Sequence, residues 1–159
     1  MAYINYENLP STRTPVNSTN LNSMQDIIEE GTWTPTIGVL NETAPTVSYT
    51  IQDGKYYKIG KLVYINFYIR GQITALNGTN NYGVIKGLPF VETAADFGKY
   101  TIPFGGNYGL CNHTEDAIGV INNNMLRLQY NNGSAATKIV VTQGDYFEIG
   151  GSGWYVTNS

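Results

Sequence analysis

The sequence predicts an all-β protein whose antiparallel strands form a β-sandwich or a jelly roll. About nine or ten short stretches alternate apolar and polar residues, and Gly, Asn or Asp separates them at regular intervals. The composition agrees, because 13 Tyr and 18 Gly in 159 residues are typical of strands that tight turns connect. A chain of this length suits one domain with at most a small appendage.

The longest predicted strand lies within residues 52–72, and its two faces differ. One face carries Val63, Ile65, Phe67 and Ile69. The other carries Leu62, Tyr64, Asn66, Tyr68 and Arg70. Because side chains alternate across a strand, the first set is expected to point into the core. Tyr64 and Tyr68 then cover a face that needs a second layer or a neighbouring subunit against it.

Before this strand the sequence predicts a short helix and then strands. Asn17, Ser18 or Thr19 can cap the helix, Leu21, Met24 and Ile28 recur at helical spacing, and Gly31 can end it. The helix is expected either to join a brief multi-helix seam or to dock on its own domain. Strands are expected at 32–39, with Trp33 buried, and at 46–52. Asp53-Gly54 predicts a two-residue hairpin turn into a strand at 55–59, and Gly60-Lys61 predicts the next turn.

After this strand the remaining strands are expected at 82–86, 99–104, 117–121, 125–130, 138–142 and 146–149. Asn122-Asn123-Asn124 is expected as the turn of a hairpin between 117–121 and 125–130. Residues 150–153 are expected to bend the chain into a last strand that holds Trp154, Tyr155 and Val156. Residues 94–98 suit a single helical turn, and 105–116 and 131–137 suit loops. The expected organisation is an N-terminal extended segment and helix at 1–31, followed by a β-sandwich head at 32–159.

The charge balance argues against nucleic acid as a partner. The net charge is −3, and nine Lys and Arg are spread thinly, whereas a nucleic-acid footprint needs a basic patch. No stretch approaches about 20 apolar residues, and no signal peptide opens the sequence, so no membrane insertion is expected. The single cysteine, Cys111, excludes an intrachain disulfide. A surface rich in Tyr and Asn suits contacts with sugars or with other protein chains.

Two groups of residues carry a resemblance to a known family. Residues 8–22, NLPSTRTPVNSTNLN, resemble the N-terminal segment of tail-fibre and baseplate proteins from bacteriophages and prophages of Gram-positive hosts. Three further phrases resemble the receptor-binding head domain at the tip of such fibres. They are GTWTPT at 31–36, YTIQDGKYYKIGKLVYINF at 49–67 and IKGLPF at 85–90.

The resemblance implies a homotrimer of β-sandwich heads in the virion tail, made in the host cytoplasm. It implies that residues 1–30 attach the chain to other phage tail or baseplate proteins. It also implies non-covalent binding of a host cell-surface polysaccharide. The alternative within the same family is a purely structural baseplate or fibre subunit that binds no receptor.

A sugar site needs an aromatic plate for the apolar face of the ring and a few fixed polar groups for its hydroxyls. The expected loop at 105–116 supplies Tyr108, Asn112 and His113, and Tyr130 precedes the next expected loop. Trp154 is a further candidate, although Trp154 and Tyr155 also suit the core or a subunit interface. The sequence thus predicts a glycan site among Tyr108, Asn112, His113, Tyr130 and Trp154.

Metal binding and catalysis find little support in the sequence. Cys111 and His113 form Cys-x-His, but no second pair completes a zinc site, and no cofactor motif is present. No GxSxG appears, so a serine nucleophile is not indicated. Glu115, Asp116, Asp145 and Glu148 could supply the carboxylate pair of a polysaccharide-cleaving enzyme, but solvated loop tips explain them as well. We therefore expect a binding or structural protein rather than an enzyme.

Overall fold

The protein is described here from a computed structural model, which covers residues 28–40, 43–78, 81–92, 100–108, 117–131 and 136–158. Of these, 106–108, 131 and 136 are described by their backbone alone. The described residues form ten strands: β1 (Ile28–Thr32), β2 (Thr36–Val39), β3 (Thr46–Ile59), β4 (Leu62–Ala75), β5 (Gly83–Lys86), β6 (Thr101–Tyr108), β7 (Ala117–Ile121), β8 (Leu126–Asn131), β9 (Ala136–Lys138) and β10 (Tyr146–Val156). They contain no helix, so the predicted all-β class is confirmed.

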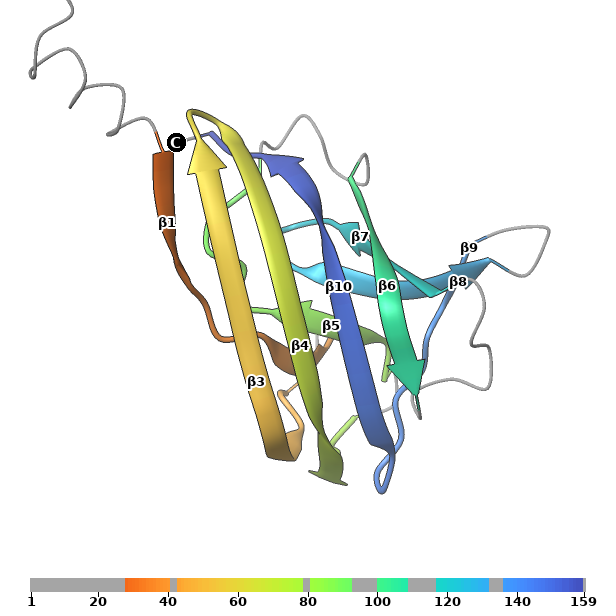
Figure 1. The fold of residues 1–159 in the computed structure, drawn as a ribbon. Helices are drawn as coiled ribbons and strands as arrows, with labels where there is room; N and C mark the ends of the chain where they lie inside the picture. Colours follow the sequence, from red (N-terminus) through yellow and green to blue (C-terminus); the bar gives the residue numbers. More distant parts are fainter. Residues whose placement is uncertain are drawn as a thin grey trace, which may run out of the picture.

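One continuous antiparallel path connects the strands. Its order is β1-β3-β4-β10-β6-β7-β8-β5-β2, and β9 lies beside β8. The path curls over itself, so that β7, β8, β5 and β2 lie behind the front portion made of β1, β3, β4, β10 and β6 (Figure 1). β6 belongs to both portions, because residues 101–103 pair with β7 and its later residues pair with β10. The hydrophobic core fills the space inside this curl.

The strand β4 has the two-sided character that its sequence predicts. Val63, Ile65 and Ile69 are fully buried and Phe67 is 2% exposed, whereas the residues between them are exposed or half-buried. Fully burying such a side chain stabilises the fold by roughly 1.5–3 kcal/mol as an upper estimate. A slip by one residue would bury Arg70 in place of Ile69, so the register of β4 is strongly fixed.

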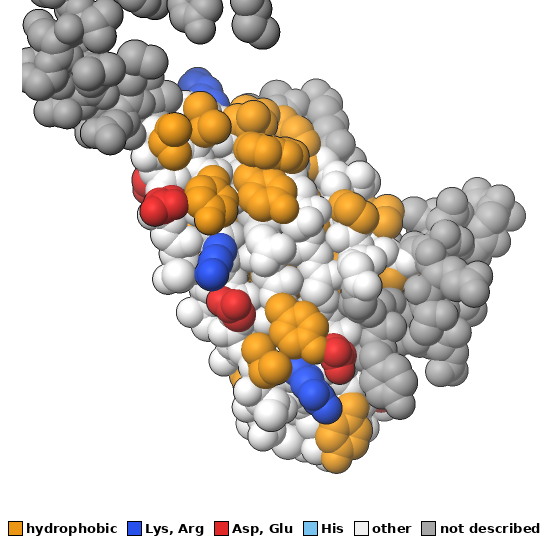
Figure 2. Space-filling model, viewed as in Figure 1, with side chains coloured by type: hydrophobic (Ala, Val, Ile, Leu, Met, Phe, Trp, Pro, Cys, Tyr) orange, Lys and Arg blue, Asp and Glu red, His pale blue; other side chains and the backbone are white. Residues whose placement is uncertain are grey.

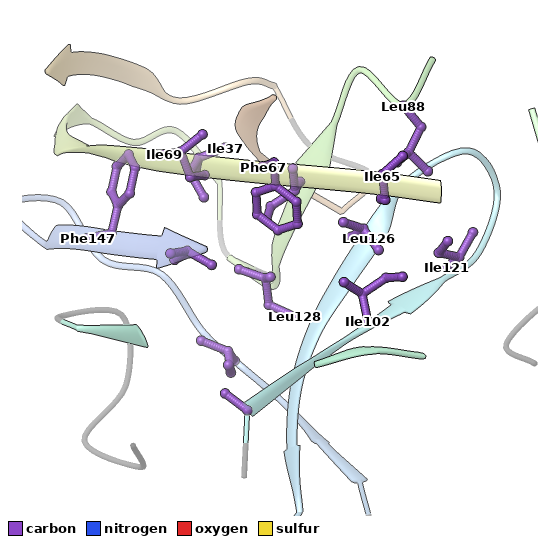
Figure 3. Packing of buried hydrophobic residues seen from close by; sticks show 14 of the residues in the cluster. Ile37, Ile65, Phe67, Ile69, Leu88, Ile102, Ile121, Leu126, Leu128 and Phe147 are labelled. Atoms are coloured by element: carbon purple, nitrogen blue, oxygen red, sulfur yellow. The ribbon is translucent and has the colours of Figure 1, made fainter. Parts of the chain in front are cut away.

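The core joins side chains from the front and back portions. Figure 3 shows Phe67 on β4 pointing toward Leu126 and Leu128 on β8, and Ile69 and Phe147 belong to the same cluster. Trp33 is 7% exposed and packs edge-on against Phe67, with ring centroids 5.7 Å apart, so its predicted burial is confirmed. These contacts connect segments that are far apart along the chain, and they hold the curl closed.

Tyr155 ties the core to the segment that follows β5. Its side chain is fully buried, and its hydroxyl donates to the carbonyl oxygen of Phe90 at 3.0 Å and accepts from the Phe90 amide at 3.2 Å. Burial raises the pKa of Tyr155 far above its usual range, so the phenol stays protonated. The tyrosine therefore satisfies the backbone donor and acceptor of Phe90, which lies outside the β-strands.

Two of the expected turns are confirmed. Gly60, with φ of 58°, and Lys61 join the paired residues Ile59 and Leu62, and glycine at the first position of a two-residue turn is typical of type II′. Asn123 and Asn124 both have positive φ, at 54° and 59°, as a type I′ turn requires.

The expected turn at Asp53-Gly54 is wrong. β3 runs without interruption through both residues, and Gly54 pairs with Phe67 of β4. Gly54 also has no left-handed backbone angle. A glycine is present because Trp33 packs directly on it: an added Cβ would lie 2.6 Å from the Trp33 carbonyl oxygen and 2.7 Å from its Nε1. The local Asp-Gly signal therefore marks a close tertiary approach, not a hairpin.

The expected bend at residues 150–153 is also wrong. β10 is one strand of 11 residues, although its register against β6 shifts between Gly150 and Gly151. Its glycines make room for side chains of neighbouring strands: a Cβ on Gly151 would lie 3.0 Å from the Phe104 ring, and one on Gly153 would lie 2.6 Å from Ile102. As at Gly54, packing explains these glycines, and the turn expected at them is absent.

The strand expected at 138–142 is wrong except at Lys138, because β9 covers residues 136–138. β9 ends at Lys138, after which the Ile139 amide donates to Leu128 and Val140 forms an isolated bridge with Tyr82. The chain here passes from the side of β8 to the side of β5, so no single neighbour can form a continuous ladder. Ile139 and Val141 are still buried, which accounts for the alternating pattern.

Of the predictions for residues 1–31, the structure tests only those for residues 28–31. Residues 1–27, which hold most of the expected helix, lie outside the described residues, as do 94–98. Ile28 to Gly31, expected as the last helical turn, instead belong to β1 and pair with β3. The expected strand at 32–39 is interrupted, since Trp33 to Pro35 separate β1 from β2. The expected domain boundary after residue 31 therefore falls inside β1.

Replacing Gly54 with alanine is expected to lower the free energy of unfolding by about 1–3 kcal/mol, because the new Cβ overlaps Trp33. The matched control is Gly105→Ala in β6, where an added Cβ meets no atom within 4 Å, and its effect is expected to stay within about 0.5 kcal/mol. Urea unfolding monitored by tryptophan fluorescence measures both. Equal midpoints for the two variants would contradict the packing role of Gly54.

Candidate functional site

Of the predicted glycan residues, Tyr130 and Trp154 have described side chains, and these two lie in different portions of the sheet. Asn112 and His113 lie outside the described residues. Tyr108, expected in a loop, is the last residue of β6, and its backbone pairs with Glu148. Tyr130 is half-buried on β8 in the back portion, whereas Trp154 is 47% exposed on β10 in the front portion.

A hollow opens instead on the outer face of the front portion, where β4, β10 and β6 run side by side. We call it the glycine groove; it encloses about 640 Å³, and its lining includes Asn66, Tyr68, Glu148, Gly150, Gly151 and Ser152. Gly150, which shares this face with Tyr68, has no side chain here, at the point where the register of β10 against β6 shifts. The Tyr68 ring lies against Gly150, since a Cβ there would come within 3.1 Å of Tyr68 Cδ2.

Tyr68 and Glu148 of the groove and the neighbouring Arg70 hold one another in place. Tyr68 and Arg70 share the outer face of β4, and Glu148 is the β10 residue directly paired with Arg70. The Tyr68 hydroxyl donates a short hydrogen bond to Glu148 Oε1, and Arg70 Nε lies 3.8 Å from Glu148 Oε2. The hydrogen bond to Glu148 raises the pKa of Tyr68, with further contributions from burial and from the carboxylate charge, while Arg70 opposes the shift.

A second, more polar hollow adjoins the glycine groove and shares Glu148 with it. It encloses about 530 Å³ between β3, β4 and β10, and its lining includes Ser48, Thr50, Arg70, Gln72 and Tyr146. Gln72 Nε2 donates to the Gly144 carbonyl oxygen at 3.2 Å, which fixes the amide, and Tyr146 is 64% exposed. Together the two hollows offer tyrosine rings, an arginine, a carboxylate and neutral hydrogen-bonding groups.

This combination suits a neutral or weakly charged ligand that is rich in hydroxyl groups. Aromatic rings can cover the apolar face of a sugar, and Asn, Gln, Ser and Arg side chains can bond its hydroxyls. Glu148 is the one carboxylate among the described residues that line either hollow, whereas glycoside hydrolysis ordinarily needs two. Asp145, another predicted candidate acid, instead accepts from the Thr142 amide at 2.8 Å.

Neither a cluster of metal ligands nor a membrane-spanning helix is found among the described residues. There, no three His, Cys, Asp or Glu side chains come together in a way that could hold a metal ion. Among the same residues, no helix has the length and apolar character to cross a membrane.

The same outer face carries a second feature, which we call the aromatic patch. It consists of Ile28, Tyr57, Ile59, Leu62, Tyr64 and Trp154. Five of these are between 41% and 57% exposed, and Tyr64 is half-buried between Tyr57 and Trp154, with ring centroids at 6.5 and 4.8 Å. Figure 2 shows the patch as the orange group at the upper end of this face, over β1, β3, β4 and β10. Trp154 thus belongs to the patch, six residues and about 20 Å along β10 from Glu148.

The sequence alone shows only the β4 residues of the glycine groove and of the aromatic patch. The outward row of β4 already contains Tyr64, Asn66, Tyr68 and Arg70, but nothing in the sequence pairs this row with β10. Glu148 is notable in the sequence only as one of several acidic residues. No family model and no curated protein matches the chain.

Replacing Glu148 with glutamine is expected to lower the pKa of Tyr68, because the charged acceptor disappears while Arg70 still favours the phenolate. The pKa can be followed by NMR of Cζ-labelled tyrosine between about pH 9 and 12, with Tyr68→Phe to assign the signal. Glu29→Gln serves as the control, because Glu29 accepts from Tyr56 and not from Tyr68. An unchanged Tyr68 titration in Glu148→Gln would contradict the described pairing.

Proposed function

We propose that this protein is a phage tail-tip protein that binds a host cell-surface polysaccharide non-covalently. Two independent observations support the proposal. The phrases at 8–22, 31–36, 49–67 and 85–90 resemble tail-fibre and baseplate proteins. Separately, the outer face of the front portion carries a hollow of the size and chemistry that suit a sugar.

The observation that carries the proposal is the Tyr68–Glu148–Arg70 arrangement beside Gly150 and Gly151. Gly150 lets the Tyr68 ring lie close to the strand backbone, and the bond from Tyr68 to Glu148 holds this ring in place. A ring held before binding loses little conformational freedom when a ligand arrives, which favours affinity. Asn66 and Ser152 lie on neighbouring paired positions and provide further hydrogen-bonding groups.

The remaining parts of the proposal follow from the resemblance. The curled antiparallel sheet serves as a jelly-roll-like head of about 130 residues, a size ordinary for one domain. Three copies form the homotrimer that the phage particle carries, and residues 1–30 attach this trimer to other tail or baseplate proteins. The chain works in the virion tail after synthesis in the host cytoplasm, and it performs no catalysis.

The second candidate function is a purely structural baseplate or fibre subunit. The aromatic patch favours it, because an exposed apolar surface of this kind suits contact with protein. This candidate predicts that particles fail to assemble without the protein, while the purified protein ignores bacterial envelopes. Only measurements of binding to bacterial envelopes distinguish this candidate from the leading proposal.

Replacing Tyr68 with alanine is expected to weaken binding to bacterial envelopes about tenfold, equivalent to about 1.4 kcal/mol, because the aromatic plate is lost. Tyr68→Phe keeps the ring and is expected to retain most of the affinity. Binding of labelled protein to a panel of Gram-positive cells, followed by an array of their purified wall polysaccharides, measures the effect.

The control for this experiment is Val140→Ala, which changes an exposed side chain near β9 in the back portion. It is expected to bind like the parent protein. A well-folded parent protein that binds no envelope would count against receptor recognition and favour the structural alternative. Equal binding by Tyr68→Ala and the parent would place the site elsewhere.

A further inference from the structure

The aromatic patch fills two adjacent rows of paired residues that cross the front portion. The first row is Ile28, Ile59, Leu62 and Val156. The second row is Glu30, Tyr57, Tyr64 and Trp154. Paired residues on neighbouring strands share a face, so these side chains form one surface. Seven of the eight are apolar or aromatic, and the one charge, Glu30, lies at the margin on β1.

The next row changes character. It contains Thr32, Lys55, Asn66 and Ser152. Asn66 and Ser152 also line the glycine groove. The outer face is therefore divided along the strands, with an apolar end, a polar boundary and then the two hollows. A partner on the apolar end can bind without covering the groove.

The apolar side chains of the patch are unusually exposed for a protein surface that contacts only water. Trp154 is 47% exposed and Ile28 57%, and they lie at opposite sides of a continuous apolar area. Monomeric proteins rarely expose contiguous apolar areas of more than a few hundred Å². Tyr and Trp are also enriched where protein surfaces meet, because they bury a large area with few rotatable bonds.

The charge distribution favours a second copy of this chain as the occupant. Two identical surfaces bring identical charges together, so a charged surface repels its own copy. The patch avoids this repulsion, because its interior carries no charge. The charges on this face next to it, Glu30 on β1 and Lys55 on β3, have opposite signs.

The position of the N-terminal segment favours the same occupant. Ile28 belongs to the patch and is also the point where residues 1–27 join the described structure. Copies that meet at their patches therefore bring their N-terminal segments together around one axis.

We infer that the aromatic patch is the surface through which copies of this chain associate, with three patches meeting around one axis. The inference rests on the homotrimer in the proposed function, and it names the residues that form its interface. Ring contacts between Tyr57, Tyr64 and Trp154 of adjacent copies exclude water there, while the glycine grooves stay accessible at the outside.

The test is the molar mass of the full chain in solution, measured by light scattering during size-exclusion chromatography. The parent protein is expected at three times the chain mass of 17.5 kDa. Leu62→Lys places a positive charge in the patch of every copy, and it is expected to shift the protein to the monomer with at least a tenfold rise in the dissociation constant. The matched control, Val140→Lys, adds the same charge to an exposed position outside the patch and is expected to remain a trimer.

Tryptophan fluorescence provides a second readout, because the chain has two tryptophans and Trp33 is buried. Acrylamide is expected to quench Trp154 weakly in the parent protein and strongly in Leu62→Lys. Circular dichroism establishes that both lysine variants remain folded. If Leu62→Lys unfolds, Leu62→Ser is used, with the same expected loss of mass.

Two results would overturn the inference. One is a trimer that survives Leu62→Lys unchanged, which leaves the proposed function intact but places the interface elsewhere. The other is a monomeric parent; if its Trp154 is protected from quencher, the chain's own N-terminal segment or a bound sugar is the occupant. Binding of folded, monomeric Leu62→Lys to bacterial envelopes is measured separately, so a failure of glycan recognition is not mistaken for a failure of the interface.

Discussion

The two-residue period of β4 is the constraint on which the rest of the structure depends. Val63, Ile65, Phe67 and Ile69 are buried without exception, so neither β3 nor β10 can slip against β4 without placing polar groups in the core. This fixed register brings Glu148 opposite Arg70 and Trp154 opposite Tyr64. The glycine groove and the aromatic patch are therefore both set by the same packing on the inner face.

The parts of the fold that depend on local patterns could be predicted from sequence. Alternation identified β4 and its buried face, and the residues of the Gly60 and Asn123-Asn124 turns identified two hairpins. The failures occur where glycine serves packing. Gly54, Gly151 and Gly153 lie in continuous strands because Trp33, Phe104 and Ile102 press against them. Sequence alone does not distinguish a glycine required by a distant side chain from one required by a turn.

The candidate site could be predicted only in part, because it depends on which strands become neighbours. Tyr68 and Glu148 are 80 residues apart in the chain, and the β4–β10 pairing that joins them leaves no local mark in the sequence. The search for a sugar site in loops also favoured Tyr108, which the structure places at the end of a strand beside Glu148. The outward aromatic row of β4 was visible in the sequence, but its division between a groove and a patch required the register of three strands.

The place of β10 in the sheet has a consequence for how the chain folds. β10 is synthesised after all the other described strands, yet it lies between β4 and β6 in the front portion. Until it leaves the ribosome, β4 and β6 have unpaired edges and Phe67 lacks part of its cover. Folding therefore waits for β10 and then closes contacts of long sequence separation, which is slow. A nascent chain of this kind exposes apolar strands for longer than a protein built from successive hairpins, so its yield depends on holding off aggregation during that interval.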